Sequence, residues 1–388
     1  MRSTTIHRRG PACRFGAAIF CLGVAACALV ARAGVDAADY ETAPPVPSMN
    51  FLEEMAPLHP VGGQAFSEFA MGDCRKYYAF AEVLAFQRDN EACNTPLVTD
   101  TVSGGTLLSV SDLNPSMAIG GRAFVGVRRA GSWGYEAGYF GVYGMTAQQS
   151  LAGAENLQLA GPLNTQVLPF QGADSVTATY ISNINSAEFN IFKSCCNVAC
   201  CTSDPCNACC NNGCCIDWLG GFRYVSVEEQ AGMTFTCCTT QPVGPFTSNY
   251  NVQTSNNLLG GQFGGRARRD WKNWAVEGWA KTGVFANLQS QSQGAIIDPT
   301  GTGTVVRDAR SSSGVAPAMM ADLNLSVIYR ISRVWGIRAG YNAIWIGGVA
   351  LAPNQWDFST ANLDAGTTLV PNGGVFLNGA NLGLEARW

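Results

Sequence analysis

Polar and apolar residues alternate with a period of two over much of the chain, most clearly from Met319 to Ile331. Asp322 and Arg330 occupy one parity of this segment, whereas Leu323 and Tyr329 occupy the other. Successive side chains of a β-strand point to opposite faces, so this pattern predicts a strand with one polar and one apolar face.

The segment from Trp335 to Gly347 predicts the second strand of a hairpin, because the link 332–334 is short. Trp335 and Trp345 lie ten residues apart on its apolar face, and Arg338 lies on the other face. Ten residues span about 33 Å of strand, or about 23 Å along the membrane normal at a tilt of about 45°. This nearly matches the apolar band of about 25 Å between the aromatic girdles of outer-membrane barrels.

The chain ends on the same alternating pattern. Leu382, Leu384 and Trp388 share one parity, and Glu385 and Arg387 share the other. A final alternating strand with a terminal aromatic residue is typical of the assembly signal of bacterial outer-membrane barrels. The predicted partners are therefore outer-membrane lipid and the barrel-assembly machinery, and the girdle candidates are Trp335, Tyr341, Trp345 and Trp388.

Weaker alternation predicts seven further strands, of which the first is apolar on both faces and leaves its register open. They lie near residues 76–87, 117–128, 133–146, 177–192, 215–229, 249–267 and 273–286. Together with the three C-terminal strands they predict an all-β fold, a single antiparallel transmembrane barrel of about ten strands, with eight to twelve compatible.

The links between these strands differ in length in a regular way. Short links at 129–132, 268–272 and 332–334 alternate with long ones near 88–116, 147–176, 230–248, 287–318 and 348–374. Outer-membrane barrels have short periplasmic turns and long outer loops, so the alternation agrees with this fold. The link 193–214 breaks the pattern, because it is long where a short turn is expected.

Composition favours a membrane barrel over a soluble β-sandwich, which stays the alternative. Charged residues make up 13% of the chain, about half the usual share of a soluble domain. The chain also has 44 glycines and 39 aromatic residues. No apolar run of about 18 residues follows the N-terminal segment, so no membrane-spanning helix is predicted.

Residues 1–33 have the features of a signal peptide: a basic start, an apolar stretch and the triplet Ala31-Arg32-Ala33 before the predicted cleavage site. A lipoprotein signal ending at Cys27 is the alternative. Residues 34–71 then form a Pro- and Ala-rich periplasmic tail or linker, and residues 72–388 form the barrel with a Cys-rich insert at 193–215. Without residues 1–33 the chain has 19 basic and 28 acidic residues, a net charge of −9, which argues against a nucleic-acid partner.

Thirteen cysteines follow the predicted cleavage site, and an exported chain meets an oxidising compartment, so disulfides are the first hypothesis. The odd number leaves one thiol free or paired with another chain, which allows a disulfide-linked or non-covalent homo-oligomer. A Zn or Cu(I) site around Cys206 and Cys209 is the alternative. The cysteines are Cys74, Cys93, Cys195, Cys196, Cys200, Cys201, Cys206, Cys209, Cys210, Cys214, Cys215, Cys237 and Cys238.

Several phrases in the chain resemble a known family. They include "LGGFRYVSVEE" at 219–229, "NNLLGGQFGGRA" at 256–267, "IRAGYNAIWIGGV" at 337–349 and the ending "GANLGLEARW". In order from about residue 76, they resemble the outer-membrane barrel family called beta-barrel porin seven, known from planctomycete-type bacteria. The resemblance implies a barrel in the outer membrane and, through the family name, a porin-like function.

The predicted barrel offers no site for an enzyme. The single histidine after residue 33 is His59 in the tail, so no Ser-His-Asp or Cys-His site is expected, and no cofactor is predicted. A narrow porin-like channel for small solutes is the first expectation, and a plugged barrel with a structural or surface-interaction role is the alternative, because ten strands enclose little space. The candidate pore-lining residues are Arg122, Glu136, Glu188, Arg223, Arg266, Glu277, Lys281, Asp322, Arg338 and Glu385.

Overall fold

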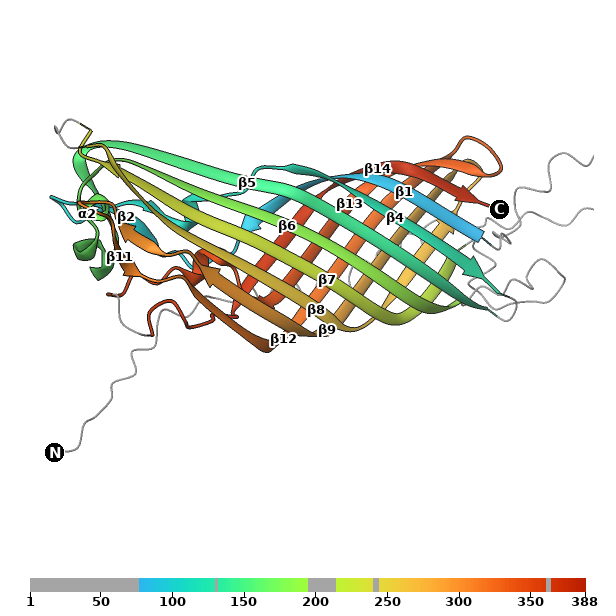
Figure 1. Cartoon of the computed structure of the whole chain (residues 1–388). Helices are drawn as coiled ribbons and strands as arrows, with labels where there is room; N and C mark the ends of the chain where they lie inside the picture. The colour runs from blue at the N-terminus through green and yellow to red at the C-terminus, as the bar shows by residue number, and fades with distance from the viewer. Residues whose placement is uncertain (1–76, 130–131, 195–213, 240–243, 361–363) are drawn as a thin grey trace, which may run out of the picture.

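Ten long antiparallel strands close into a barrel in the computed structural model, which describes residues 77–388 except 130–131, 195–213, 240–243 and 361–363 (Figure 1). Each strand pairs with the next along the chain, and the pairing of the first with the last closes the ring. The ten-stranded barrel is thus confirmed. Its strands are β1 (Tyr77–Asn90), β4 (Ala118–Arg128), β5 (Trp133–Leu159), β6 (Ala173–Ser194), β7 (Cys214–Cys237), β8 (Phe246–Asp270), β9 (Trp274–Gln293), β12 (Arg310–Arg330), β13 (Trp335–Val349) and β14 (Gly373–Arg387).

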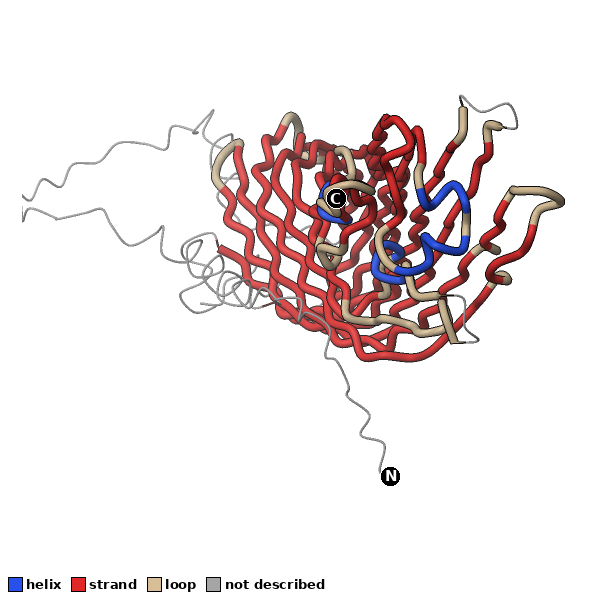
Figure 2. The backbone as a smooth tube through the Cα atoms, turned by 90° about the vertical axis from the view of Figure 1, so that its left-hand side faces the viewer, coloured by secondary structure: helices blue, strands red, loops and turns tan. Residues whose placement is uncertain are grey.

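The two ends of the barrel differ. Short turns and the C-terminus lie at one end, here called the short-turn end (Figure 1). The opposite, long-loop end carries the remaining small elements: β2 (Pro96–Asp100), β3 (Thr106–Ser109), η1 (Val110–Asp112), η2 (Pro162–Gln166), α2 (Leu168–Gln171), β10 (Ile296–Asp298), β11 (Thr304–Arg307) and η4 (Ala352–Gln355). Seen from the long-loop end, strands form a curved wall with helical segments inside its curve (Figure 2).

An apolar band surrounds the outside of the barrel near the short-turn end. Outward-facing side chains such as Val125, Phe222, Phe263, Leu325 and Leu382 are all more than half exposed. Charged residues in the same stretches of strand, by contrast, point inward and are buried. An exposed apolar surface backed by an enclosed polar interior is the arrangement that a strand takes in lipid.

Several strands continue well beyond their predicted ends. β5 runs to Leu159, β9 to Gln293, and β12 begins at Arg310, so parts of the predicted long links 147–176 and 287–318 are strand. Beyond the apolar band these strands carry polar side chains on both faces, such as Gln291 inside and Ser292 outside. A strand that is polar on both faces has no hydropathy alternation, so its sequence resembles a loop.

None of the helices in the described residues is long and apolar enough to cross a membrane. The predicted signal peptide at 1–33, the tail at 34–71, Cys74 and the cysteines from Cys195 to Cys210 lie outside the described residues.

Candidate functional site: the barrel interior

All ten candidate pore-lining residues lie inside the barrel, and each is at most 8% exposed. They are not spaced around an open channel. Oppositely charged side chains from different strands contact one another across the interior, together with further inward-facing acids and bases. These buried ion pairs form what is here called the ionic layer, which fills the half of the barrel nearer the short-turn end.

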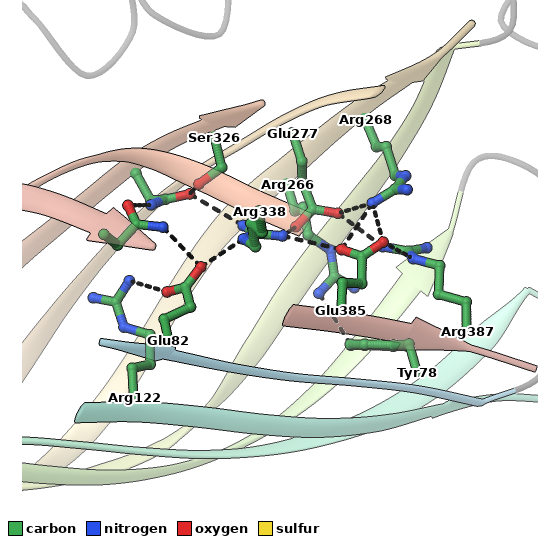
Figure 3. A network of polar contacts seen from close by, with 12 residues as sticks. Tyr78, Glu82, Arg122, Arg266, Arg268, Glu277, Ser326, Arg338, Glu385 and Arg387 are labelled. Atoms are coloured by element: carbon green, nitrogen blue, oxygen red, sulfur yellow. Dashed lines mark hydrogen bonds and ion pairs between the residues drawn. The ribbon is translucent and has the colours of Figure 1, made fainter. Parts of the chain in front are cut away.

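The most connected member of the ionic layer is Arg338 on β13 (Figure 3). Its guanidinium lies 2.7 Å from Glu82, 2.7 Å from Glu277 and 3.2 Å from Glu385. Arg268 and Arg387 approach Glu277 and Glu385 from the other side, at 2.9–3.2 Å for Arg268 and 2.7–3.0 Å for Arg387. Buried charges cost solvation energy unless they are paired, and here each carboxylate meets more than one cation.

A second group of charges lies around Arg266 on β8. Its guanidinium is 2.7 Å from Glu136 and 2.8 Å from Asp217, and Tyr78 donates a hydrogen bond of 2.6 Å to Glu136. Lys281 lies 3.8 Å from Glu136 and 3.0 Å from Glu188, so it joins this group to Glu188.

Aromatic side chains fill the space between the charged groups. Phe80, Phe124 and Trp279 pack together with ring centroids 5.0–6.2 Å apart. Arg338 lies 4.5 Å from the Phe80 ring centroid, and Lys281 lies 4.8 Å from that of Phe124. A cavity of about 10 Å³ beside them has room for about one water molecule.

An apolar layer follows the ionic layer toward the long-loop end. All ten strands contribute buried side chains to it, so it extends across the whole interior. Its members include Phe86, Ala118, Phe140, Ile184, Val225, Leu258, Phe285, Met320, Ile344 and Leu377. Most inward side chains at this level are apolar. The polar ones beside them, such as Asn256 and Asn287, bond to each other and to the main chain, so water has few partners there.

The loop between β13 and β14, residues 350–372, packs on the inner face of the strands beyond the apolar layer. Asn256 holds its start through two hydrogen bonds with the main chain of Ala350, 2.7 and 2.9 Å long. Gln291 donates to the carbonyl of Thr368 at 2.8 Å, and Gln293 to that of Gln355 at 2.8 Å. Inward-facing amides thus satisfy the main chain of a loop that would otherwise be buried without partners.

Hydrogen bonds to the carboxylate of Asp357, here called the Asp357 clip, close the middle of this loop. The carboxylate accepts hydrogen bonds from the amides of Ser359 at 2.9 Å and Gly366 at 2.7 Å. Partial burial raises the pKa of Asp357, but these hydrogen bonds and the charge of Arg307 lower it by more, so the net shift is downward. Arg307 also donates to the carbonyls of Asp357 and Ser359, at 3.0 and 2.8 Å.

One further buried ion pair links the loop to the barrel wall. Arg88 and Glu229 lie 2.6 Å apart, and both side chains are 0% exposed. Glu229 also accepts a hydrogen bond of 2.9 Å from the amide of Ala352 in the loop. The pair therefore links β1, β7 and the loop on the long-loop side of the apolar layer.

The chain matches the family model described as "Putative beta barrel porin-7" over residues 80–388. The chain belongs to this family. The resemblance of the Gly- and aromatic-rich phrases to beta-barrel porin seven is thus confirmed, and the match includes most of β1 and the whole of the other nine barrel strands.

The solved structures similar to this beta barrel porin-7 chain share about 10% sequence identity with it. The outer membrane protease OmpT from Escherichia coli gives a TM-score of 0.44, with 81% of this chain and 97% of that chain covered. Ail of Yersinia pestis gives 0.21, with 81% and 99% covered at 10% identity. A Pseudomonas aeruginosa FadL homologue gives 0.24, with 81% and 90% covered at 10% identity. No curated protein matches the chain.

Several interior residues of this beta barrel porin-7 chain escaped the sequence analysis. Glu82 was missed because β1 is apolar on both faces, which hides its register. Asp217 and Arg387 share the parity of the predicted Arg223 and Glu385, so the alternation alone could have placed them inside. The apolar layer gave no usable signal, because inward apolar residues look like lipid-facing ones in a single strand.

The other candidate residues lie on the surface or at the strand ends. Trp335, Tyr341 and Trp388 point outward and are 50–55% exposed, whereas Trp345 is half-buried. Cys237 ends β7 and Cys238 follows it, with their sulfur atoms 2.7 Å apart. Cys214 and Cys215 begin β7, and Cys93 follows β1. No group of three or more His, Cys, Asp or Glu side chains in the described part of the chain is arranged to hold a metal ion.

Proposed function

We propose that this protein is an integral outer-membrane barrel that is closed in its resting state and serves a structural or surface-exposed role in the cell envelope. The apolar layer carries this proposal, since all ten strands contribute buried apolar side chains to it. In this orientation the long-loop end faces outward, because outer-membrane barrels place short turns in the periplasm.

The packing of the ionic layer and of the β13–β14 loop supports the same function. The charges of the ionic layer are paired with one another rather than presented to a solute. The β13–β14 loop covers the inner face at the long-loop end and is tied there by at least four side chains of β8 and β9: Tyr250, Asn256, Gln291 and Gln293. Ten strands enclose little more than side chains in any case.

A narrow porin-like channel for small solutes is the second candidate, and the porin description of the family favours it. Such a channel needs the β13–β14 loop to move and the apolar layer to become wet. The charged residues of the ionic layer would then border the path.

Export, membrane partners and the absence of catalysis belong to the proposal as well. We expect a cleaved signal peptide at 1–33, insertion by the barrel-assembly machinery through β14, and contact with outer-membrane lipid. Residues 77–388 contain no histidine, which agrees with a non-enzymatic role. The disulfide and homo-oligomer hypotheses for the Cys-rich segment also remain part of it.

Single-channel recording in planar lipid bilayers tests the two candidates. Folded protein should insert without producing conductance steps at neutral pH, and a lipid-embedded general porin recorded in parallel should produce them. Regular conductance steps from the folded chain, at a frequency proportional to the protein added, would contradict the closed barrel and favour the porin-like channel.

A further inference from the structure

A polar groove crosses the outer surface of five strands toward the long-loop end. Its first row of side chains, Asn183, Glu228, Ser255, Ser290 and Ser313, is in register from β6 through β12. A second row one step further along each strand pairs Gln230, Gln253, Ser292 and Ser311 in the same way. The groove has a volume of about 540 Å³, which is within the range of small-ligand sites.

The residue types explain why this outer surface is hollow. Serines on β8, β9 and β12 project little from the sheet and form a floor, as at Ser290 and Ser292. Glu228, Gln230 and Gln253 project further and form a wall along one side.

The groove lies just beyond the apolar band. Leu259 on β8 is 60% exposed and pairs with the outward Ala286 on β9, so this level faces lipid. Ser255 lies four residues further along β8, about 13 Å of strand or about 9 Å along the membrane normal at a tilt of about 45°. The headgroup layer of a leaflet is about 5–8 Å thick, so the groove is level with its outer edge.

Most polar side chains of the groove are not used by the fold, although Asn183 accepts a hydrogen bond of 2.8 Å from the amide of Gly144. Elsewhere on the outer face, neighbouring polar side chains bond to each other, as Thr234 does to Asn249 at 2.8 Å and Tyr224 to Asn257 at 2.6 Å. Within the described residues, the side chains of Glu228, Gln230 and Gln253 have no such partner.

The groove therefore offers hydroxyl and amide groups, which both donate and accept hydrogen bonds, and one carboxylate, which accepts them. No Lys, Arg or His lines it. An anionic headgroup would find no cation here and would be repelled by Glu228, whereas a ring carrying several hydroxyls matches these donors and acceptors.

We propose that this groove binds the uncharged saccharide headgroup of a glycolipid in the surrounding leaflet. The groove opens sideways on the barrel wall, directly beyond the lipid-facing surface, so a lipid can place its headgroup there while its chains cover the apolar band. This site is independent of whether the interior conducts.

Native mass spectrometry of the folded, detergent-solubilised protein tests the site with three probes: digalactosyl diacylglycerol, phosphatidylglycerol and free digalactose. The galactolipid should bind with a Kd about tenfold lower than that of the anionic lipid. Ser290→Tyr, which fills the floor, should raise that Kd about tenfold, and Gln253→Ala should raise it without adding bulk. Ser150→Tyr on the outer face of β5 is the matched control and should leave it unchanged.

The other outcomes count against the proposal. Preference for phosphatidylglycerol, or unchanged galactolipid binding by folded Ser290→Tyr protein, overturns the site. Equal affinity for free digalactose and the galactolipid would contradict the claim that the bound saccharide belongs to a lipid, and would indicate a site for soluble glycans. Folding of each variant is checked by the mobility difference between heated and unheated samples in gels.

Discussion

At the scale of single residues, the interior of this barrel is held by charges that are buried and paired with opposite charges. Arg338 has a side chain that is 0% exposed and contacts three carboxylates from three different strands. A buried ion pair adds little net stability compared with apolar packing, but removing one partner leaves the others uncompensated. Individual members of the ionic layer are therefore expected to be highly sensitive to substitution.

Replacing Arg338 with alanine should strongly destabilise the barrel. The substitution leaves Glu82, Glu277 and Glu385 short of a cation, at a cost of about 3–5 kcal/mol. Reversible urea unfolding of the refolded protein in lipid vesicles measures the effect. Lys272→Ala in an exposed turn is the control and should change stability by less than about 0.5 kcal/mol. A similarly small change for Arg338→Ala would mean that the ionic layer is not needed for stability.

The clip at Asp357 predicts a pH dependence of the β13–β14 loop. Its pKa is lowered in the folded protein, so the carboxylate stabilises the loop above the unfolded pKa of about 3.9 and loses this effect as pH falls through the folded value. The loop should therefore stay closed at neutral pH and loosen below about pH 4. Hydrogen exchange of the amides of Ser359 and Gly366, corrected for intrinsic rates, should rise in that window. Asp357→Asn should raise it already at neutral pH, and exchange that is equal at pH 7 and pH 3 would contradict the role of the clip.

The sequence predicted individual interior residues well where a strand has one polar and one apolar face. Asp322 and Arg338 were placed inside by parity alone, and both are buried there. Parity cannot show which charges meet, because partners such as Arg266 and Glu136 are 130 residues apart. It also cannot distinguish an inward Phe285 from an outward Val284 when both are apolar.

At the scale of elements, each long strand combines two environments along its length. β9 has the lipid-facing Val284 and Leu288 in one part and the outward Ser290 and Ser292 in the other. All ten strands were predicted in the right order, because the lipid-facing parts alternate, clearly in the three C-terminal strands and more weakly in most of the others. The extensions were missed, since hydrogen bonding to neighbouring strands, not hydropathy, keeps the polar parts in the sheet.

Replacing Ala339 on the outer face of β13 with arginine should impair insertion. Ala339 pairs with the exposed Leu382, so its side chain is in the apolar band. A charge near the bilayer midplane of a barrel costs about 2–4 kcal/mol. The yield of folded protein in vesicles measures the effect. Thr234→Arg, on an outward position beyond the band, should fold at the wild-type level, and normal folding of Ala339→Arg would contradict the lipid-facing register of β13.

Deleting residues 197–212 should leave the barrel able to insert. β6 and β7 pair continuously from Ser175 and Thr236 to Ser194 and Asp217, so the hairpin does not need the intervening segment for its register. We expect the deletion to abolish reducible multimers that depend on its cysteines. Non-reducing gels and thiol counting of both proteins check this. Fully reduced cluster cysteines with stoichiometric zinc in the intact protein would favour the metal hypothesis instead.

At the scale of the whole molecule, three levels fill the interior in series: the ionic layer, the apolar layer and the β13–β14 loop. The levels resist water for different reasons. The ionic layer consists of groups that water can solvate, and the loop is tied by hydrogen bonds that water can replace. The apolar layer offers water few partners, so it should be the decisive barrier.

This order of barriers predicts how the barrel can be opened. Replacing residues 351–371 with a short Gly-Ser linker should leave the protein non-conducting, because the apolar layer remains. Phe140→Ser with Phe285→Ser should wet that layer, since hydroxyls give water partners where two rings were, but the loop still covers it. The combination of both changes should produce conductance steps in planar bilayers, with the ionic layer as a hydrated lining. Shortening the β10–β11 turn at 299–303 is the matched loop control and should have no effect. Steps from the loop replacement alone would show that the loop, and not the apolar layer, is what closes the barrel.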